Sequence, residues 1–234
     1  FAMTVTAGRA LAEGQFPKNS VVELFTSQGC SSCPAADRLL QQLAQRPDII
    51  AMSLPVTYWD YLGWRDTLAK QEFTQRQRDY ASARGDGEVY TPQVVVNGLK
   101  GCVGSDLSAI ESAVRSTAHI VDKEAVGLQV RRDGSRLIVD AGSAAPESQH
   151  KSGKVFVAAI ARAVTVPVGR GENAGRTLTY TNVVRKLVEA GQWQGAPTSY
   201  AVSLDAFPKD RDMLVVFLQA DHLGPIVGAA RIDG

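Results

Sequence analysis

Apolar and polar positions in the first half of the chain alternate between strand-like and helix-like patterns. Residues 20–25 and 49–56 are apolar or β-branched runs flanked by polar residues, which predicts two buried strands. Apolar residues recur at helical spacing over 35–43, directly after Pro34. Proline is tolerated there because its missing N–H would be unpaired in a first helical turn. The remaining predicted elements of this half are a helix over 68–84, strands over 93–96 and 100–103, and a helix over 107–118.

Beyond residue 122 the pattern changes to short apolar or alternating segments bounded by Gly, Pro or Asp. Asp133-Gly134, between the first two of them, is a hairpin signal. The predicted strands cover 126–130, 136–141, 154–164, 177–187, 199–204, 213–219 and 226–232. We therefore predict an α/β domain over residues 18–122, followed by a β-rich, sandwich-like domain over residues 123–234.

The composition is that of a globular protein and argues against several classes of function. The 234 residues are 44% apolar and 21% charged, and the net charge of +1 gives no electrostatic case for nucleic acid or an anionic membrane as partner. No apolar run approaches the ~20 residues that a membrane-spanning helix needs. The start, Phe1-Ala2-Met3, lacks the charged beginning and apolar core of a signal peptide. The oligomeric state is left open.

The motif Cys30-Ser31-Ser32-Cys33 lies between a predicted strand and the helix that Pro34 begins. A thiol attacks a disulfide as the thiolate, and the unpaired N–H groups of a helix N-terminus favour that charge. Cys30, at or before the terminus, is predicted to be the more exposed nucleophile, and Cys33 the resolving thiol. The motif thus predicts a thiol–disulfide oxidoreductase without a cofactor, whose partner is a disulfide- or dithiol-bearing protein or a small thiol.

The alternatives for the cysteine pair are a metal site, an iron–sulfur cluster and a structural disulfide. A zinc site normally has four ligands, and only Cys102 and three scattered histidines remain, so we predict no metal site. Three cysteines are too few for a four-thiolate iron–sulfur cluster unless two chains share it. The main alternative is a non-catalytic binding module with a structural disulfide, which a buried Cys30 would favour. Cys102 is predicted to be a small buried residue in or beside the last strand of the first half.

A family resemblance supports this interpretation. Residues 22–34, with Ala36 and Asp37 after them, closely resemble the opening signature of a bacterial family catalogued as domain of unknown function 1223, within the thioredoxin-like superfamily. The resemblance implies a thioredoxin-like fold for the α/β domain and a periplasmic or secreted setting, otherwise a cytoplasmic one. It implies no known substrate. Later segments that resemble the family's blocks are 58–64, 90–93, 171–173 and 182–184.

Two segments are predicted to border the cysteine pair. In thioredoxin-like folds a cis-proline packs beside the pair and the residue before it binds an extended peptide; Thr91 and Pro92 stand at that place in the predicted topology. Tyr58 and Trp59 belong to an aromatic segment whose simpler role is packing on the core. Its functional role would be a groove wall beside Cys30. These four residues are our candidate substrate-binding residues.

Residues 169–176 form a glycine-rich segment that fits neither the dinucleotide-binding nor the phosphate-binding loop motif. We predict a flexible hairpin loop here. Its polar residues could reach over the cysteine pair; they are Arg170, Glu172, Asn173 and Arg176.

Overall fold

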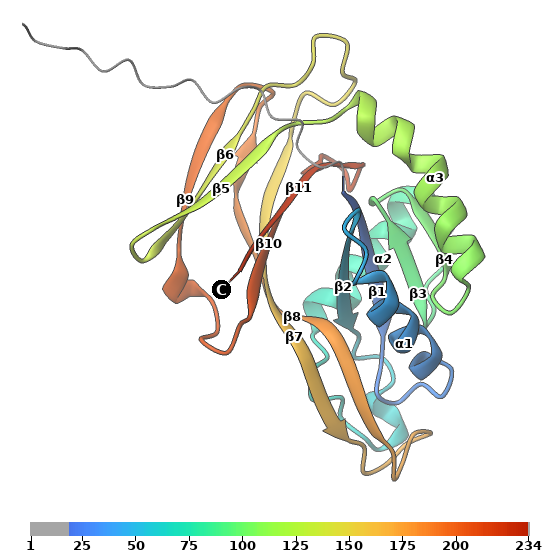
Figure 1. The fold of residues 1–234 in the computed structure, drawn as a ribbon. Helices are drawn as coiled ribbons and strands as arrows, with labels where there is room; N and C mark the ends of the chain where they lie inside the picture. Colours follow the sequence, from blue (N-terminus) through green and yellow to red (C-terminus); the bar gives the residue numbers. More distant parts are fainter. Residues whose placement is uncertain (1–18, 234) are drawn as a thin grey trace, which may run out of the picture.

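The computed structural model describes residues 19–233. Residues 1–18, which include the Phe1-Ala2-Met3 start and the first residue of the predicted α/β domain, lie outside the described residues, as does residue 234. An eight-stranded mixed sheet has the order β11-β10-β7-β8-β2-β1-β3-β4 (Figure 1). Its strands are β1 (Ser20–Thr26), β2 (Ile49–Pro55), β3 (Gln93–Val96), β4 (Lys100–Val103), β7 (Gly153–Pro167), β8 (Thr177–Trp193), β10 (Met213–Ala220) and β11 (Ile226–Asp233).

Three helices cover the part of this sheet that comes from the first half of the chain. Along β1, Val22 and Leu24 pack beneath one pair of helices, whereas Val21 and Phe25 point to the opposite face and a third helix. This alternation follows from the two-residue repeat of a strand, and it explains why β1 is apolar on both faces. The pair is α1 (Cys33–Leu43) and α3 (Leu107–Lys123), and the third helix is α2 (Gln71–Arg84) (Figure 1).

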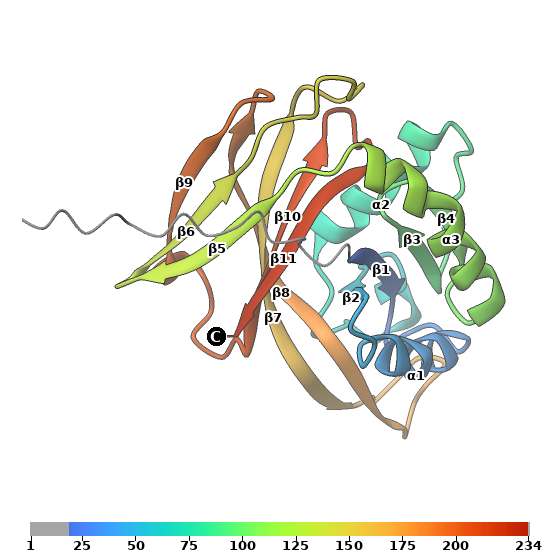
Figure 2. The same ribbon diagram turned by 45° about the horizontal axis from the view of Figure 1, so that its top comes forward.

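The second half of the chain adds strands to the same sheet. β8 pairs in parallel with β2 at Ser53 and Val183, and β7, β10 and β11 follow beyond it. A small antiparallel sheet faces these outer strands and shares a core with them that includes Leu137, Trp193 and Val216 (Figure 2). Its strands are β5 (Leu128–Asp133), β6 (Arg136–Ala141) and β9 (Thr198–Ser203). The division of the chain at residues 122 and 123 stays a prediction, because one sheet contains strands from both sides of it.

The predicted order of helices and strands agrees with the structure, and the differences concern their ends. α2 begins at Gln71 rather than at residue 68, because the Asp66 carboxylate accepts the N–H groups of Leu68 and Ala69 and holds them in a turn. The predicted strands 154–164 and 177–187 extend further, to Pro167 and Trp193. The extension of β7 forms part of the projecting end of the β7–β8 hairpin, opposite Thr177, whereas the extension of β8 pairs with the start of β7 (Figure 1).

The turn between β3 and β4 joins the two halves. It has positive φ angles at Asn97 (52°) and Gly98 (73°), as a two-residue Asn-Gly hairpin turn requires. The carbonyl oxygen of Asn97 accepts the N–H of Ile226 at 2.9 Å. A Cβ atom on Gly98 would lie 2.7 Å from the carbonyl oxygen of Gly224, so only glycine permits this close approach.

A buried ion pair lies at the centre of the molecule. The side chains of Glu23 in β1 and Arg76 in α2 are 1% and 7% exposed, and Nε of Arg76 donates to Oε1 of Glu23 at 2.7 Å. The hydroxyl of Tyr80 donates to the same carboxylate, and Nη2 of Arg76 donates to Gln219 of β10 at 3.0 Å. The guanidinium also lies over the ring of Tyr80, 4.8 Å from its centroid. This network fastens one helix and two distant strands to each other.

Replacement of Arg76 by methionine is expected to lower the free energy of unfolding by about 3–5 kcal/mol, because it leaves the Glu23 carboxylate buried without its counter-ion. The double variant Glu23→Gln/Arg76→Met removes both charges, and its free energy of unfolding should fall clearly less than that of the single variant. Urea unfolding followed by circular dichroism measures both. A single variant as stable as the wild type would contradict the importance of this pair.

Candidate functional site around the cysteine pair

The cysteine motif forms the connection between β1 and α1. Cys30 and Cys33 are joined by a disulfide with their Cα atoms 5.4 Å apart, and α1 begins at Cys33. The N–H of Cys30 donates to the carbonyl oxygen of Ser27, and the N–H of Cys33 to that of Cys30, both at 3.2 Å. Pro34 occupies the first turn of α1, as predicted. The pair therefore lies at a helix N-terminus, whose backbone dipoles favour a thiolate.

Both cysteines are buried, which corrects one expectation. Cys30 is 1% exposed and Cys33 is 0% exposed, so the two cysteines do not differ in exposure as the sequence predicted. The reason lies in segments far along the chain. The carbonyl oxygen of Thr91 lies 3.8 Å from Sγ of Cys30, and the side chain of Asn173 is hydrogen-bonded to the carbonyl oxygen of Cys30.

A hydroxyl group contacts the sulfur of Cys30. Oγ of Ser32 lies 3.3 Å from this sulfur. Because a disulfide sulfur carries no hydrogen, the Ser32 hydroxyl is the donor. In the reduced pair the same hydroxyl can donate to a Cys30 thiolate, and a hydrogen bond to the charged form lowers the pKa of a thiol.

The Thr91–Pro92 peptide bond is cis, as expected, and it precedes β3 beside the cysteine pair. Thr91 is fixed from its other side, since its hydroxyl oxygen accepts the indole N–H of Trp59 at 2.7 Å. The carbonyl oxygen of Pro92 accepts the N–H of Gly104 at 2.9 Å. A Cβ atom on Gly104 would lie 2.8 Å from Leu24 and 3.2 Å from Pro92, so a glycine is needed for this packing.

The aromatic segment borders the motif on one side. Trp59 packs against Gly29, where an added Cβ atom would lie 3.1 Å from its own Cβ. The indole N–H of Trp64 donates to the side chain of Gln28 at 2.8 Å. The Tyr58 hydroxyl donates to Gln77 of α2 at 3.2 Å, and burial raises its pKa. The structure thus brings Trp59 and Thr91 together next to the pair, while Tyr58 is joined to α2.

The β7–β8 loop, residues 168–176, covers the motif from the other side. Its Asn173 is wholly buried, and Nδ2 donates to the carbonyl oxygens of Gln28 and Cys30 at 2.9 and 2.8 Å. Oε2 of Glu172 accepts the N–H of Ser31 at 2.9 Å, and hydrogen bonds from Ser31 lower the pKa of this glutamate. Arg176 acts through Asn173, to whose Oδ1 it donates at 2.8 Å. Of the four polar residues named from the sequence, Glu172 and Asn173 contact the motif, and Arg176 contacts Asn173.

A polar cluster that the sequence did not reveal lies beneath α1. Asp37, one helical turn after Cys33, is buried, and the Thr26 hydroxyl donates to its Oδ1 at 2.9 Å. Burial raises the pKa of Asp37 to about 8. Its other carboxylate oxygen has no hydrogen-bond partner among the described residues, nor have the hydroxyls of Ser53 and Tyr180. The spacing of four residues from Cys33 on a predicted helix was the signal that could have identified Asp37.

Cys102 is not part of this site. It lies in β4, half-buried and free, opposite Val94. Burial raises the pKa of its thiol to about 11, which keeps it protonated and unreactive near neutral pH. Among residues 19–233 there is no group of three or more residues placed to hold a metal ion. In the same part of the chain, no helix is long and apolar enough to cross a membrane.

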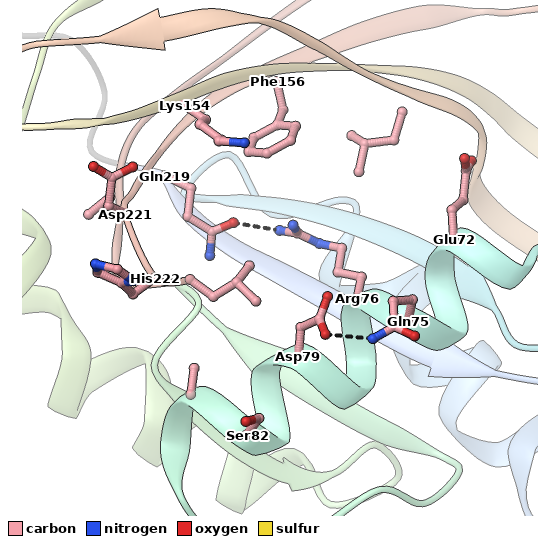
Figure 3. A pocket seen from close by; sticks show the side chains of 14 residues that line it. Glu72, Gln75, Arg76, Asp79, Ser82, Lys154, Phe156, Gln219, Asp221 and His222 are labelled. Carbon is pink, nitrogen blue, oxygen red and sulfur yellow. Dashed lines mark hydrogen bonds between the residues drawn. The ribbon is translucent and has the colours of Figure 1, made fainter.

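A pocket of about 690 Å³ lies away from the motif, between α2 and the strands β7, β8 and β10 (Figure 3). Arg76 and Gln219 form part of its wall, and its mouth carries both acidic and basic side chains, among them Asp79 and Lys154. Its lining shares no residue with the cysteine site. Because the pocket does not reach the cysteine pair, we assign it no part in cysteine chemistry.

Comparison with known proteins gives a family and a fold. The model of the family described as "Protein of unknown function (DUF1223)" matches residues 21–219. The crystal structure of protein AGR_C_4864 from Agrobacterium tumefaciens is 32% identical, with a TM-score of 0.80, over 93% of this chain and 95% of that one. Hypothetical protein PH1083 from Pyrococcus horikoshii OT3 is 10% identical over 47% of this chain and 86% of its own, and its TM-score of 0.21 is too low to indicate a shared fold. No curated protein sequence matches this chain.

The raised pKa of Asp37 predicts a pH-dependent stability. Because the folded state holds this proton more tightly than the unfolded chain, the contribution of Asp37 to stability is fully present below about pH 4 and falls as pH rises towards 8, by up to about 1.4 kcal/mol per pH unit. Asp37→Asn keeps an acceptor for Thr26 and cannot ionise, so its stability should fall less over this range. Urea unfolding at a series of pH values measures the slope. Equal slopes in variant and wild type would refute the assignment.

Proposed function

This chain belongs to the DUF1223 family of proteins of unknown function, and we propose that it is a thiol–disulfide oxidoreductase with a thioredoxin-like domain. Cys30 is the nucleophile and Cys33 the resolving thiol. The observation that carries the proposal is the Cys30–Cys33 disulfide at the start of α1, with the Ser32 hydroxyl directed at the sulfur of Cys30. The cis peptide bond of Pro92 beside the pair supports it.

In the proposed cycle the reduced pair attacks a partner disulfide. The Cys30 thiolate forms a bond to one partner sulfur, and the other partner sulfur leaves as a thiolate. Cys33, as thiolate, then attacks the sulfur of Cys30, which forms the intramolecular disulfide and releases the second partner sulfur. The partner gains two electrons and, from solvent, two protons. An external dithiol returns the pair to its reduced form, and the same steps in reverse oxidise a partner dithiol.

The partner we propose is a disulfide- or dithiol-bearing protein or a small thiol. Thr91 and Pro92 would bind the partner's polypeptide beside Cys30. Trp59 holds Thr91 in place, and Tyr58, which is hydrogen-bonded to Gln77 of α2, supports the same side of the site. A periplasmic or secreted setting suits the proposal because disulfides persist in oxidising compartments. A cytoplasmic setting is the alternative.

A second candidate is a binding module whose disulfide is structural. The 1% exposure of Cys30 favours it, because a nucleophile must be reached by its substrate. We favour the enzyme because Ser31 and Ser32, which flank this sulfur, are exposed, and because one of the segments that enclose Cys30 is an exposed hairpin loop. The two candidates differ in whether the pair exchanges under mild conditions.

The proposal predicts that the reduced protein accelerates the reduction of insulin disulfides by dithiothreitol, and that Cys30→Ser abolishes this activity. Cys33→Ser should instead remain joined to its substrate through Cys30, because the resolving thiol is gone. Cys102→Ser is the matched control, since it removes a thiol outside the pair and should retain the activity. A pair that is inert in this assay and has a very low reduction potential would support the binding module.

Trp59→Phe removes the N–H that Thr91 accepts while it keeps an aromatic ring. We expect KM for a protein disulfide to rise several-fold with little change in kcat, because the substrate-binding backbone at Thr91 loses its support and the cysteines are untouched. Steady-state kinetics with increasing insulin concentration measures both constants. A loss confined to kcat would contradict a binding role for this wall.

A further inference from the structure

The β7–β8 loop is placed to control access to the disulfide that it covers. We propose that this loop is a gate over the cysteine pair, that Glu172 and Asn173 are the positioning residues that keep it closed, and that a partner must displace the loop before exchange begins. This inference rests on the proposed function for the reaction that is gated. The gate itself consists of contacts between segments more than 140 residues apart in the sequence.

The first contact of the gate occupies a backbone donor of the motif. The N–H of Ser31 lies just ahead of α1, between the two cysteines, and Glu172 accepts it at 2.9 Å. A carboxylate beside a helix N-terminus is electrostatically favoured. Glu172 thus occupies the Ser31 N–H, which an incoming partner would otherwise use as a hydrogen-bond donor.

The second contact fixes the backbone on both sides of Gly29. Asn173 donates from one nitrogen to the carbonyl oxygens of Gln28 and Cys30, and its own oxygen accepts from Arg176. All of the strong hydrogen-bonding atoms of this buried amide are therefore used in the closed position. Asn173 anchors the closed loop, whereas the exposed Glu172 is its releasable contact.

The loop is organised as a unit that can move without unfolding. Backbone hydrogen bonds between Val168 and both Gly175 and Arg176 close its base. Gly171 and Gly175 have φ angles of 79° and 77°, which glycine adopts without strain. The loop rests on the ring of Trp64, which would lie 2.8 Å from a Cβ atom added to Gly169. Apart from Val168 at its base and Asn173, the residues of the loop are exposed or partly exposed, so its displacement removes few side chains from the core.

The gate has a consequence for the class of partner. A polypeptide that offers a carbonyl or carboxylate oxygen near its reacting cysteine can take the Ser31 N–H from Glu172 and remain bound as the loop opens. A small thiol without such a group has no contact that compensates for the lost one. We therefore infer that the gated site prefers polypeptide partners over simple small thiols.

The test measures how fast an uncharged phosphine, tris(3-hydroxypropyl)phosphine, reduces the oxidised protein. The phosphine attacks a sulfur and breaks the S–S bond, and water supplies the oxygen of the phosphine oxide while two thiols form. Glu172→Ala should react at least about tenfold faster than the wild type, because a hydrogen bond to a charged acceptor is lost from the closed state. Glu172→Gln keeps an acceptor oxygen and should fall between them. Alkylation and peptide mass spectrometry separate Cys30 and Cys33 from Cys102.

Glu147→Ala is the matched control, since it removes an exposed glutamate from a loop that does not contact the motif, and it should react like the wild type. Unchanged thermal midpoints show that faster reduction is not caused by global unfolding. Equal rates for Glu172→Ala and the wild type would overturn the gate. A phosphine reduces the pair whatever its reduction potential, so this outcome is independent of the insulin assay, whose failure would instead overturn the proposed function.

Discussion

The cost of burying the guanidinium of Arg76 governs how this molecule is held together. A charge so deeply enclosed requires an opposite charge and hydrogen-bond acceptors. Glu23, Tyr80 and Gln219 supply acceptors to Nε and Nη2 from β1, α2 and β10. Apolar contacts tolerate small slips between elements, whereas a hydrogen-bonded ion pair accepts only one arrangement. The network therefore fixes α2 and the strands of both halves in one register, and the loops at the far ends of those strands inherit their positions from it.

The cysteine site shows how such a frame brings distant residues together. The motif contributes the sulfurs and a donating hydroxyl, the segment around Thr91 contributes one wall, and the β7–β8 loop closes the other. Family membership and the likeness to the Agrobacterium tumefaciens protein extend this fold to relatives without attaching an activity to it. What distinguishes the arrangement is that the disulfide is both at a helix N-terminus and enclosed, so its reactivity depends on the segments that enclose it.

Local patterns in the sequence were sufficient for the helices, the strands and the cysteine motif, because each depends on neighbouring residues. The cis-proline was instead expected from the thioredoxin-like fold and the place of Thr91 and Pro92 in the predicted topology. The contact between Glu172 and Ser31 was beyond reach, since nothing in a glycine-rich hairpin specifies the distant backbone that it will touch. The burial of Cys30 follows from long-range contacts with Thr91 and Asn173, which is why the predicted difference in exposure between Cys30 and Cys33 is not seen. The sequence also could not show that strands of both halves belong to one sheet. The strand β2 is apolar on both faces whether its neighbour is β1 alone or β8 as well.

The junction between β2 and β8 is narrow, with one paired position at Ser53 and Val183 and one side-chain bond from Asn182 to the carbonyl oxygen of Ala51. A chain cut after α3 would uncover the β8 side of β2, an edge that is apolar apart from Ser53, and would free the backbone groups that β8 now contacts. Such an edge is a template for association with other chains. The second half of the protein is thus also a cap that keeps the sheet of the first half from propagating, and this constrains how the two parts could be separated in evolution.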